Sequence, residues 1–372
     1  MPGPGNEAGL AADNAMRAAD AYTAMQTAFY KPSAKLYRES FKYDPLLDQS
    51  IGYLWSFEEA AAATLYLYGM PGAANTYATA VQDRLSARET YWDGGTTLRA
   101  YRSYPTAGDR YYDDNCWVGT NLLQHHLMTS TGANTTALDR ARAVSSYIQT
   151  GWMTDLPRPG GVRWIDSPSN GDRATDSTAG WAKLGAHLYD AMGRRSPSYL
   201  DWAIRAYDWL KQNLLAANGL YGNSVRADGT VDRTQWIYNQ GIVIGAAVLL
   251  NRVTGTAHYL DDAVRLADAA LAFFATDAYY SGTMGAYDGR AIFNAIFFRN
   301  LLMLYAVTRN AVYFQKMQAY ADAAWSDPKV RDPKTNLFKL NGGSRYSLLD
   351  QAAMVQVYAC LSWSPITYSR LT

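Results

Sequence analysis

The sequence predicts an all-α protein that folds as an (α/α)6 barrel, a toroid of six helical hairpins, and three observations lead to this fold class. Apolar residues recur with a helical period in twelve segments, while strand-like alternation is limited to short extended pieces near 158–166 and 219–233. Short and long connections alternate along the chain. Every second segment is apolar on nearly all sides, which is typical of a buried helix.

The twelve segments form a repeat. They lie near residues 9–29, 53–69, 73–88, 115–130, 135–149, 177–192, 198–213, 238–252, 256–274, 291–307, 311–326 and 347–361. The even-numbered ones begin at intervals of about 54–62 residues, each after a long loop and before a short turn. This pattern predicts six inner helices, six amphipathic outer helices and a single domain over residues 1–372, with the long loops gathered where the inner helices begin.

The composition excludes some kinds of partner. The 34 basic and 33 acidic residues give a net charge of +1, so neither a nucleic acid nor an anionic membrane is expected to bind. The 11 Trp and 29 Tyr outnumber the 10 Phe, a bias that suits carbohydrate clefts, although large helical cores also use Tyr. No apolar stretch approaches about 18 uninterrupted residues, so no transmembrane helix is expected. We expect a monomer.

Cysteine and histidine usage predicts neither a metal site nor a cofactor. Cys116 and Cys360 lie in apolar helical stretches and are expected to be buried thiols. The four histidines show no metal-ligand spacing, and His125 and His126 are interpreted as structural. The first five residues have neither a basic start nor an apolar core, so they are not a signal peptide. The location stays open between the cytoplasm and, if a signal was removed, a secreted or cell-envelope protein.

The stretch from Tyr111 to Trp117 carries the main functional indication. It places Asp113 and Asp114 side by side among aromatic rings, where a long loop turns into a helix. A glycosidase needs two carboxyl groups, and flat rings stack on sugars. Helix capping is the alternative explanation for two acids at such a place. The other pair, Asp261-Asp262, is followed by small and aliphatic residues and is interpreted as capping only.

Other polar and aromatic residues stand near the predicted starts of the inner helices. Each alone has a structural explanation: Trp55 and Phe293 suit a core, and Asn239 suits a cap. Their joint placement at one end indicates a binding rim. The predicted substrate-binding residues are Trp55, Tyr112, Asn115, Trp117, Tyr238, Asn239, Gln240, Asn294 and Arg345.

The motifs resemble those of a known family. Tyr112-Asp113-Asp114-Asn115-Cys116-Trp117, Tyr238-Asn239-Gln240-Gly241 and Ile296-Phe297-Phe298-Arg299 are similar to the signature of glycoside hydrolase family 76, over roughly residues 10–345. Its best-known members are endo-α-1,6-mannanases with an (α/α)6 barrel and a retaining mechanism. The resemblance implies an α-mannan substrate, with Asp113 as the nucleophile and Asp114 as the general acid/base.

Two departures put the substrate in question. Asn294 and Ala295 stand where the family has Lys-Gly, and Cys116 is unusual between Asn115 and Trp117. The alternatives are a transglycosylase, an enzyme acting on another glycan and a non-catalytic glycan-binding toroid. Zinc prenyltransferases and sugar epimerases share the toroid, but the chain lacks their ligand set and their paired histidines.

Overall fold

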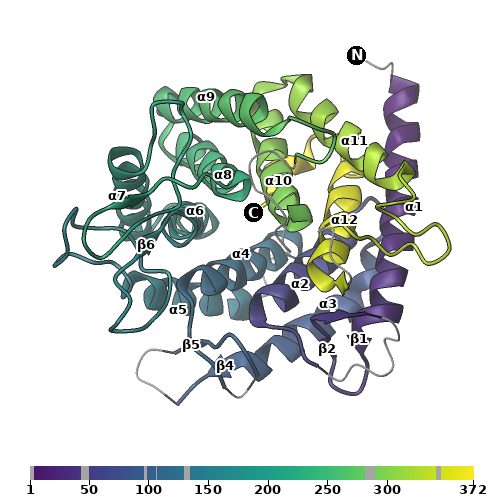
Figure 1. Cartoon of the computed structure of the whole chain (residues 1–372), viewed down its shortest axis with the longest axis horizontal. Helices are drawn as coiled ribbons and strands as arrows, with labels where there is room; N and C mark the ends of the chain where they lie inside the picture. Colours follow the sequence, from purple (N-terminus) through teal and green to yellow (C-terminus); the bar gives the residue numbers. More distant parts are fainter. Residues whose placement is uncertain are drawn as a thin grey trace. The chain divides into compact units, whose positions relative to one another are not determined.

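The computed structural model describes residues 4–42, 50–95, 99–105, 107–129, 135–280, 290–340 and 345–372. Within these ranges there are twelve α-helices (Figure 1). They are α1 (Pro4–Phe29), α2 (Leu54–Tyr68), α3 (Ala74–Arg88), α4 (Tyr112–Thr129), α5 (Thr135–Gln149), α6 (Thr175–Ala191), α7 (Pro197–Asn213), α8 (Ile237–Thr254), α9 (Ala257–Phe274), α10 (Arg290–Thr308), α11 (Ala311–Ser326) and α12 (Leu348–Leu361). The twelve predicted helices are confirmed, and the largest boundary difference is at α1, which begins at Pro4 rather than near residue 9.

The strands are two residues long and connect loops. They are β1 (Tyr30–Lys31), β2 (Leu36–Tyr37), β3 (Ser40–Phe41), β4 (Trp92–Asp93), β5 (Ala100–Tyr101), β6 (Arg173–Ala174), β7 (Ser224–Val225), β8 (Val231–Asp232) and β9 (Tyr346–Ser347). All pair antiparallel: β1 with β2, β3 with β9, β4 with β5, and β6, β7 and β8 in one sheet. The extended piece predicted over 219–233 contains β7 and β8. The other strands were not predicted, because two residues are too few to show a period.

The chain divides into two compact units, each with its own packed helices. Unit 1 comprises residues 1–90 and 274–369, and unit 2 comprises residues 91–273 and 370–372. In unit 1, α12 packs against α1, α2 and α10. In unit 2, α6 packs against α4, α7 and α8, and α5 packs against α4. The single domain over 1–372 stays a prediction.

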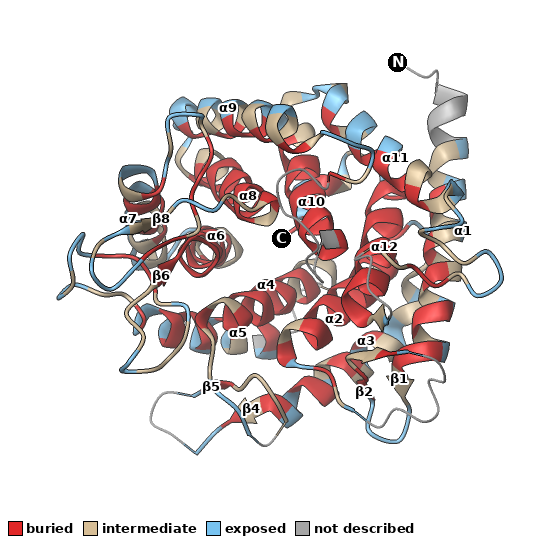
Figure 2. Ribbon diagram, in the orientation of Figure 1, coloured by how far each residue is buried: buried red, intermediate tan, exposed pale blue. Residues whose placement is uncertain are grey.

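Burial distinguishes inner from outer helices, as predicted. All 14 residues of α12 are buried, whereas α7 buries only five of its 17. Figure 2 shows the same contrast between α6, which is buried nearly throughout, and α9, which has an exposed face. The sequence pattern explains this difference, since an outer helix needs an apolar stripe on one side only.

Small residues bring α4 and α6 close together in unit 2. A Cβ atom added to Gly180 would lie 2.9 Å from the Cβ of Cys116, and one added to Gly119 would lie 2.7 Å from Leu184. Cys116 therefore fills the contact with α6, which gives a physical reason for a small side chain there. The prediction that Cys116 and Cys360 are buried thiols is confirmed.

Helix α10 combines an apolar surface with a buried ion pair. Its segment 291–308 is long and apolar enough to cross a membrane, yet 78% of it is buried inside the protein. It carries Arg299, which donates to Glu59 at 3.3 Å and to Gln356 at 3.0 Å. Asn294, Arg299 and Asn300 interrupt the apolar run, and the expectation that no helix crosses a membrane stays a prediction.

The capping interpretation of Asp261-Asp262 is wrong. Helix α9 begins at Ala257, so both acids lie beyond its first turn. Asp262 instead accepts hydrogen bonds from Lys211 at 2.6 Å and from Tyr207 at 3.3 Å, both on α7, and also pairs with Arg265. Asp262 therefore joins an outer helix to its neighbour.

Candidate active site

Both candidate acids lie in the first turn of α4. The helix begins at Tyr112, earlier than the predicted start near 115, so Asp113 is its second residue and Asp114 its third. The backbone N–H of Tyr112 donates to the carbonyl of Trp164 at 2.9 Å, which fastens the preceding loop to the helix start. A helix N-terminus favours negative charge, because its first N–H groups have no partner within the helix.

Asp113 is hydrogen-bonded to an exposed aromatic side chain. Its Oδ2 accepts a hydrogen bond from Nε1 of Trp164 at 3.1 Å, while its Oδ1 has no partner among the described residues. The Trp164 side chain is 43% exposed and meets Tyr111 edge to face at 5.0 Å. This combination of a carboxyl and an accessible indole suits a sugar, whose hydroxyls bind the acid while its apolar face meets the ring.

The surroundings of Asp113 disfavour its charged form. Burial raises its pKa well above the ordinary value, and the negative charges of Asp176 and Asp114 raise it further. Hydrogen bonds from the Asp114 backbone and from Trp164 act in the opposite direction. The carboxyl thus holds a proton more strongly than an exposed aspartate does.

Asp176 was not singled out by the sequence. It is the second residue of α6 and is only 8% exposed. Its Oδ1 accepts from the backbone N–H of Ser177 at 2.6 Å and from the Ser177 hydroxyl at 3.3 Å, and its Oδ2 accepts from the Tyr238 hydroxyl at 3.0 Å. Burial raises the pKa of Asp176, against the effect of these bonds. Tyr238, a predicted site residue, is the second residue of α8.

One regularity would have revealed Asp176. Asp113, Asp176 and Tyr238 each stand second in their inner helix, at intervals that match the hairpin repeat. Aligning the repeat units would therefore have placed the three side chains at equivalent positions. Read singly, Asp176 is an ordinary acid in a first helical turn.

Two predicted binding residues hold loops to helices. Asn115, the fourth residue of α4, accepts from the backbone N–H of Tyr101 at 2.9 Å and donates to its carbonyl at 3.0 Å. Gln240, the fourth residue of α8, binds Tyr221 in the same two-way manner, at 2.8 and 3.0 Å. Each side-chain amide thus pairs with both the N–H and the C=O of one loop residue, as the backbone of a neighbouring β-strand would.

The fourth residue also holds a loop to the helix in two further inner helices, α6 and α12. Thr178 of α6 accepts from the backbone N–H of Val162 at 2.9 Å. Gln351 of α12, in unit 1, accepts from the backbone N–H of Phe338 at 2.9 Å. We call Asn115, Thr178, Gln240 and Gln351 the loop-anchoring residues.

The other predicted residues of unit 2 are buried. Tyr112 is fully buried and stacks on Tyr147 at 4.9 Å, and Trp117 is 8% exposed. Asn239 is fully buried, and neither its Oδ1 nor its Nδ2 has a partner among the described residues. An unpaired buried amide is costly, so a polar ligand or water is expected beside Asn239.

Three predicted residues belong to unit 1. Trp55 is half-buried and stacks on Phe293 at 6.1 Å. Asn294 is 1% exposed and donates to a backbone carbonyl at 2.8 Å. Arg345 is exposed and donates to the side chain and carbonyl of Ser40 at 3.0 and 3.2 Å.

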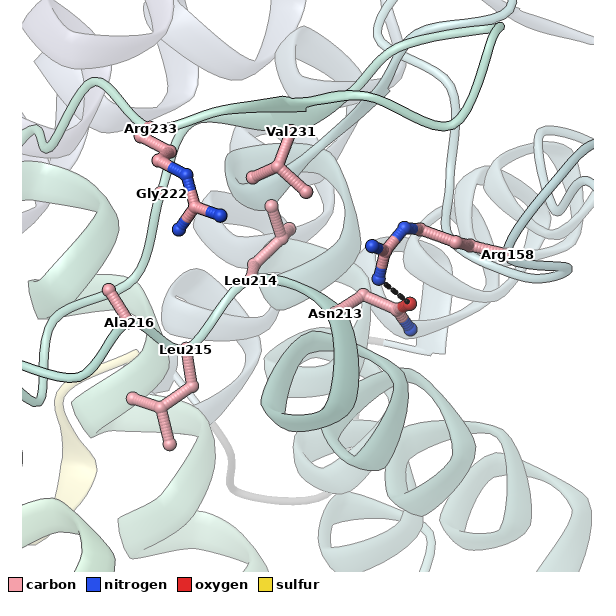
Figure 3. A pocket seen from close by; sticks show the side chains of 8 residues that line it. All are labelled: Arg158, Asn213, Leu214, Leu215, Ala216, Gly222, Val231 and Arg233. Carbon is pink, nitrogen blue, oxygen red and sulfur yellow. Dashed lines mark hydrogen bonds between the residues drawn. The ribbon is translucent and has the colours of Figure 1, made fainter.

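A cavity of about 150 Å³ in unit 2 is lined by residues from the end of α7 and from adjacent loops (Figure 3). Arg158 and Arg233 flank it, and Arg158 donates to Asn213 at 3.3 Å. Its described lining contains no carboxyl group, so the acids lie outside it. Within the described ranges, no group of three or more His, Cys, Asp or Glu side chains could hold a metal ion.

Two adjacent acids at a helix start, one of them bonded to an exposed tryptophan, on a scaffold of helical hairpins, are an arrangement typical of glycoside hydrolases. The chain belongs to glycosyl hydrolase family 76, whose model matches residues 13–362. The family predicted from the motifs is confirmed.

Solved structures confirm the fold class, an (α/α)6 toroid. A family 76 mannosidase of Bacteroides thetaiotaomicron superposes with a TM-score of 0.82 at 24% identity, covering 94% of this chain and 98% of that one. An α-1,6-mannanase of Salegentibacter sp. HEL1_6 superposes with a TM-score of 0.78 at 19% identity, covering 94% and 99%. The latter is an inactive variant with two consecutive aspartates changed to asparagine, in complex with α-1,6-mannotriose.

Two yeast proteins match shorter stretches. A mannan endo-1,6-α-mannosidase of Candida glabrata is 30% identical over 130 residues, which are 32% of this chain and 29% of that protein. Its namesake from Saccharomyces cerevisiae is 26% identical over 236 residues, which are 58% and 52% of the two chains. The matched stretches thus cover about half or less of these curated relatives.

Proposed function

We propose that the chain is a retaining, endo-acting α-1,6-mannanase. The observation that carries the proposal is the Asp113–Asp114 pair in the first turn of α4, with Trp164 bound to Asp113. The yeast relatives are mannan endo-1,6-α-mannosidases, and the Salegentibacter enzyme is inactive without its two consecutive aspartates. Both facts support the substrate and the roles of the acids.

The proposed reaction runs in two steps, with the roles that the family resemblance gives. Asp114 donates a proton to the glycosidic oxygen while Asp113 attacks the anomeric carbon, so that the C–O bond to the leaving sugar breaks and a covalent glycosyl-enzyme forms. Asp114, now ionised, then takes a proton from water. The resulting hydroxide attacks the anomeric carbon and releases Asp113.

The electrostatics of the site add a condition. Asp113 must be ionised to attack, yet its burial and the neighbouring acids raise its pKa. The N–H group of Trp164 and the α4 N-terminus favour the ion and partly compensate. We therefore expect hydrolysis to fall as the pH drops through this raised pKa, at a higher pH than an ordinary aspartate would give.

Around the acids we propose a sugar-binding groove. Within unit 2, Trp164 joins the predicted residues as a ring that stacks on mannose, and the unpaired amide of Asn239 binds a hydroxyl. We also propose a role for Asn294, which stands where the family has Lys. Asn294→Lys should change the ratio of rates on linear and branched mannan, and an unchanged ratio would show that this residue has no role in substrate choice.

We also propose that both units form one catalytic domain, which acts as a monomer without a cofactor. The family match supports the single domain, because its residues 13–362 run through both units.

The test is hydrolysis of linear α-1,6-mannan by Asp113→Asn and Asp114→Asn. Each should lose at least about 100-fold in rate, because a nucleophile or a general acid is removed. Asp261→Asn is the matched control, since Asp261 belongs to an adjacent pair of acids but is exposed on α9. Short oligosaccharides from the wild type support hydrolysis. Longer products indicate a transglycosylase, and binding without turnover indicates a glycan-binding protein.

A further inference from the structure

We propose that Asp176 is a third acidic residue of the active site, a positioning residue that acts through Asp113 and controls the pH range in which hydrolysis runs. The inference deepens the proposed function and rests on it, because it concerns the same attack by Asp113. Three features of unit 2 carry it: the bonds that hold Asp176, the contact between two helix starts, and the effect of a further negative charge.

Asp176 is held in one orientation by donors from two helices. Three hydrogen bonds reach its carboxylate: two from Ser177 on α6 at 2.6 and 3.3 Å, and one from the Tyr238 hydroxyl on α8 at 3.0 Å. All three donate to the carboxylate, and Asp176 also stands in the first turn of α6, so each favours the charged form. Burial opposes these donors and raises the pKa of Asp176, but it raises that of Asp113 further, so Asp176 carries its charge when Asp113 ionises.

The N-terminal parts of α4 and α6 are in contact. Sγ of Cys116 donates to the carbonyl of Ser177 at 3.6 Å, and the missing side chain of Gly180 allows this approach. Asp113 precedes Cys116 by three residues, so both lie on one face of α4. Because Asp176 precedes Ser177, this contact sets the start of α6 beside the start of α4, within the distance at which the charge of Asp176 acts on Asp113.

A fixed charge at this place has two effects on a glycosidase. It opposes ionisation of Asp113, which moves the acidic limb of the activity profile to higher pH. It also adds negative potential where positive charge develops on the sugar in the transition state. The first effect narrows the pH range, and the second lowers the barrier once Asp113 is ionised.

The other groups near Asp113 do not replace this charge. Asp114 acts on Asp113 from the same helix, but less than Asp176 does, and Cys116 is a buried thiol whose own pKa is raised. Arg163 is directed toward Tyr112, Ser167 and Asp166. The indole of Trp164 donates one hydrogen bond and carries no charge.

That indole provides a direct measurement. Its Nε1–H is bonded to Asp113, so the proton NMR shift of this group should titrate as Asp113 ionises, with Trp164→Phe used to assign the signal. In Asp176→Asn we expect the titration midpoint to fall by about one pH unit or more, because a like charge has been removed. Asp261→Asn should leave the midpoint in place. An unchanged midpoint in folded Asp176→Asn would overturn the inference.

Kinetics give the second measurement. In Asp176→Asn the acidic limb of kcat/KM on α-1,6-mannan should move to lower pH by the same amount, while kcat on the plateau falls about tenfold. A purely structural role would leave the limb where it is. A wild type that does not cleave mannan, but whose indole midpoint moves in the variant, would overturn the proposed function and leave the action of Asp176 on Asp113 standing.

Discussion

Replacing Asp113 with asparagine should make the protein more stable at neutral pH while it loses hydrolysis. Asp113 is half-buried with its Oδ1 enclosed, and burial together with the charges of Asp176 and Asp114 raises its pKa well above the ordinary value. An amide of the same shape removes the charge and keeps an oxygen that can accept from Trp164. Function and stability therefore oppose each other at this position.

The size of the gain has a lower and an upper estimate. Two carboxylates about 5 Å apart repel by about 3 kcal/mol at an effective dielectric constant of about 20. The weaker hydrogen bond from Trp164 to an amide takes back about 1 kcal/mol. At pH 7 the penalty cannot exceed about 4 kcal/mol, since each unit between the ordinary pKa of about 3.9 and pH 7 is worth about 1.4 kcal/mol. After the loss of about 1 kcal/mol is subtracted from both estimates, we expect a gain of about 2–3 kcal/mol.

The pH dependence of the free energy of unfolding shows the direction of the effect of Asp113. In the unfolded chain Asp113 ionises above about pH 4, whereas in the folded protein its raised pKa delays ionisation to a higher pH. The wild type therefore loses stability as the pH rises from about 4 through the raised pKa, and Asp113→Asn does not. Urea unfolding followed by circular dichroism should show the difference at pH 7 and little of it at pH 4, with Asp261→Asn unchanged. Equal stability of variant and wild type at pH 7 would refute the reasoning.

Three further predictions concern the loops, the core and metals. Gln240→Ala should cost about 1–3 kcal/mol, because the backbone of Tyr221 loses both partners, and urea unfolding measures it; a change in KM alone would favour a substrate role instead. Arg299→Met should cost about 3–5 kcal/mol by the same assay, since it leaves Glu59 buried without its cation, and Glu59→Gln in the same chain should recover part of the loss. Dialysis against a chelator should leave mannan hydrolysis unchanged, because two carboxyl groups suffice for the chemistry; activity restored by one divalent ion would contradict this.

The sequence predicted the helices well because their signal is local. A helical period is visible within one segment, so even α10 was found, although Arg299 interrupts its apolar run. The adjacent acids Asp113 and Asp114 were found for the same reason. The Asp-Asp pair in α9 shows where prediction from a local pattern fails. The sequence does not distinguish an acid that caps a helix from one that forms an ion pair with a distant residue such as Lys211.

The contacts of the site could not be predicted in the same way. Trp164 stands in a long loop, and nothing in its neighbours indicates that its N–H reaches Asp113. Asn115 and Gln240 were predicted to bind sugar, since polar residues at a helix start suit both a ligand and a loop. Only coordinates show that each amide binds one backbone residue twice.

The loop-anchoring residues have a consequence for how such an enzyme can change. Asn115, Thr178 and Gln240 each bind one backbone residue of a loop and so fix the position of that residue against the helix. An insertion or deletion elsewhere in the loop therefore need not rotate the helix. A residue inserted between the second and fourth positions would turn Asp113 or Asp176 by about 100° relative to its anchor. Loops of different length and specificity can therefore be exchanged on this scaffold, while the few residues between acid and anchor cannot change in number.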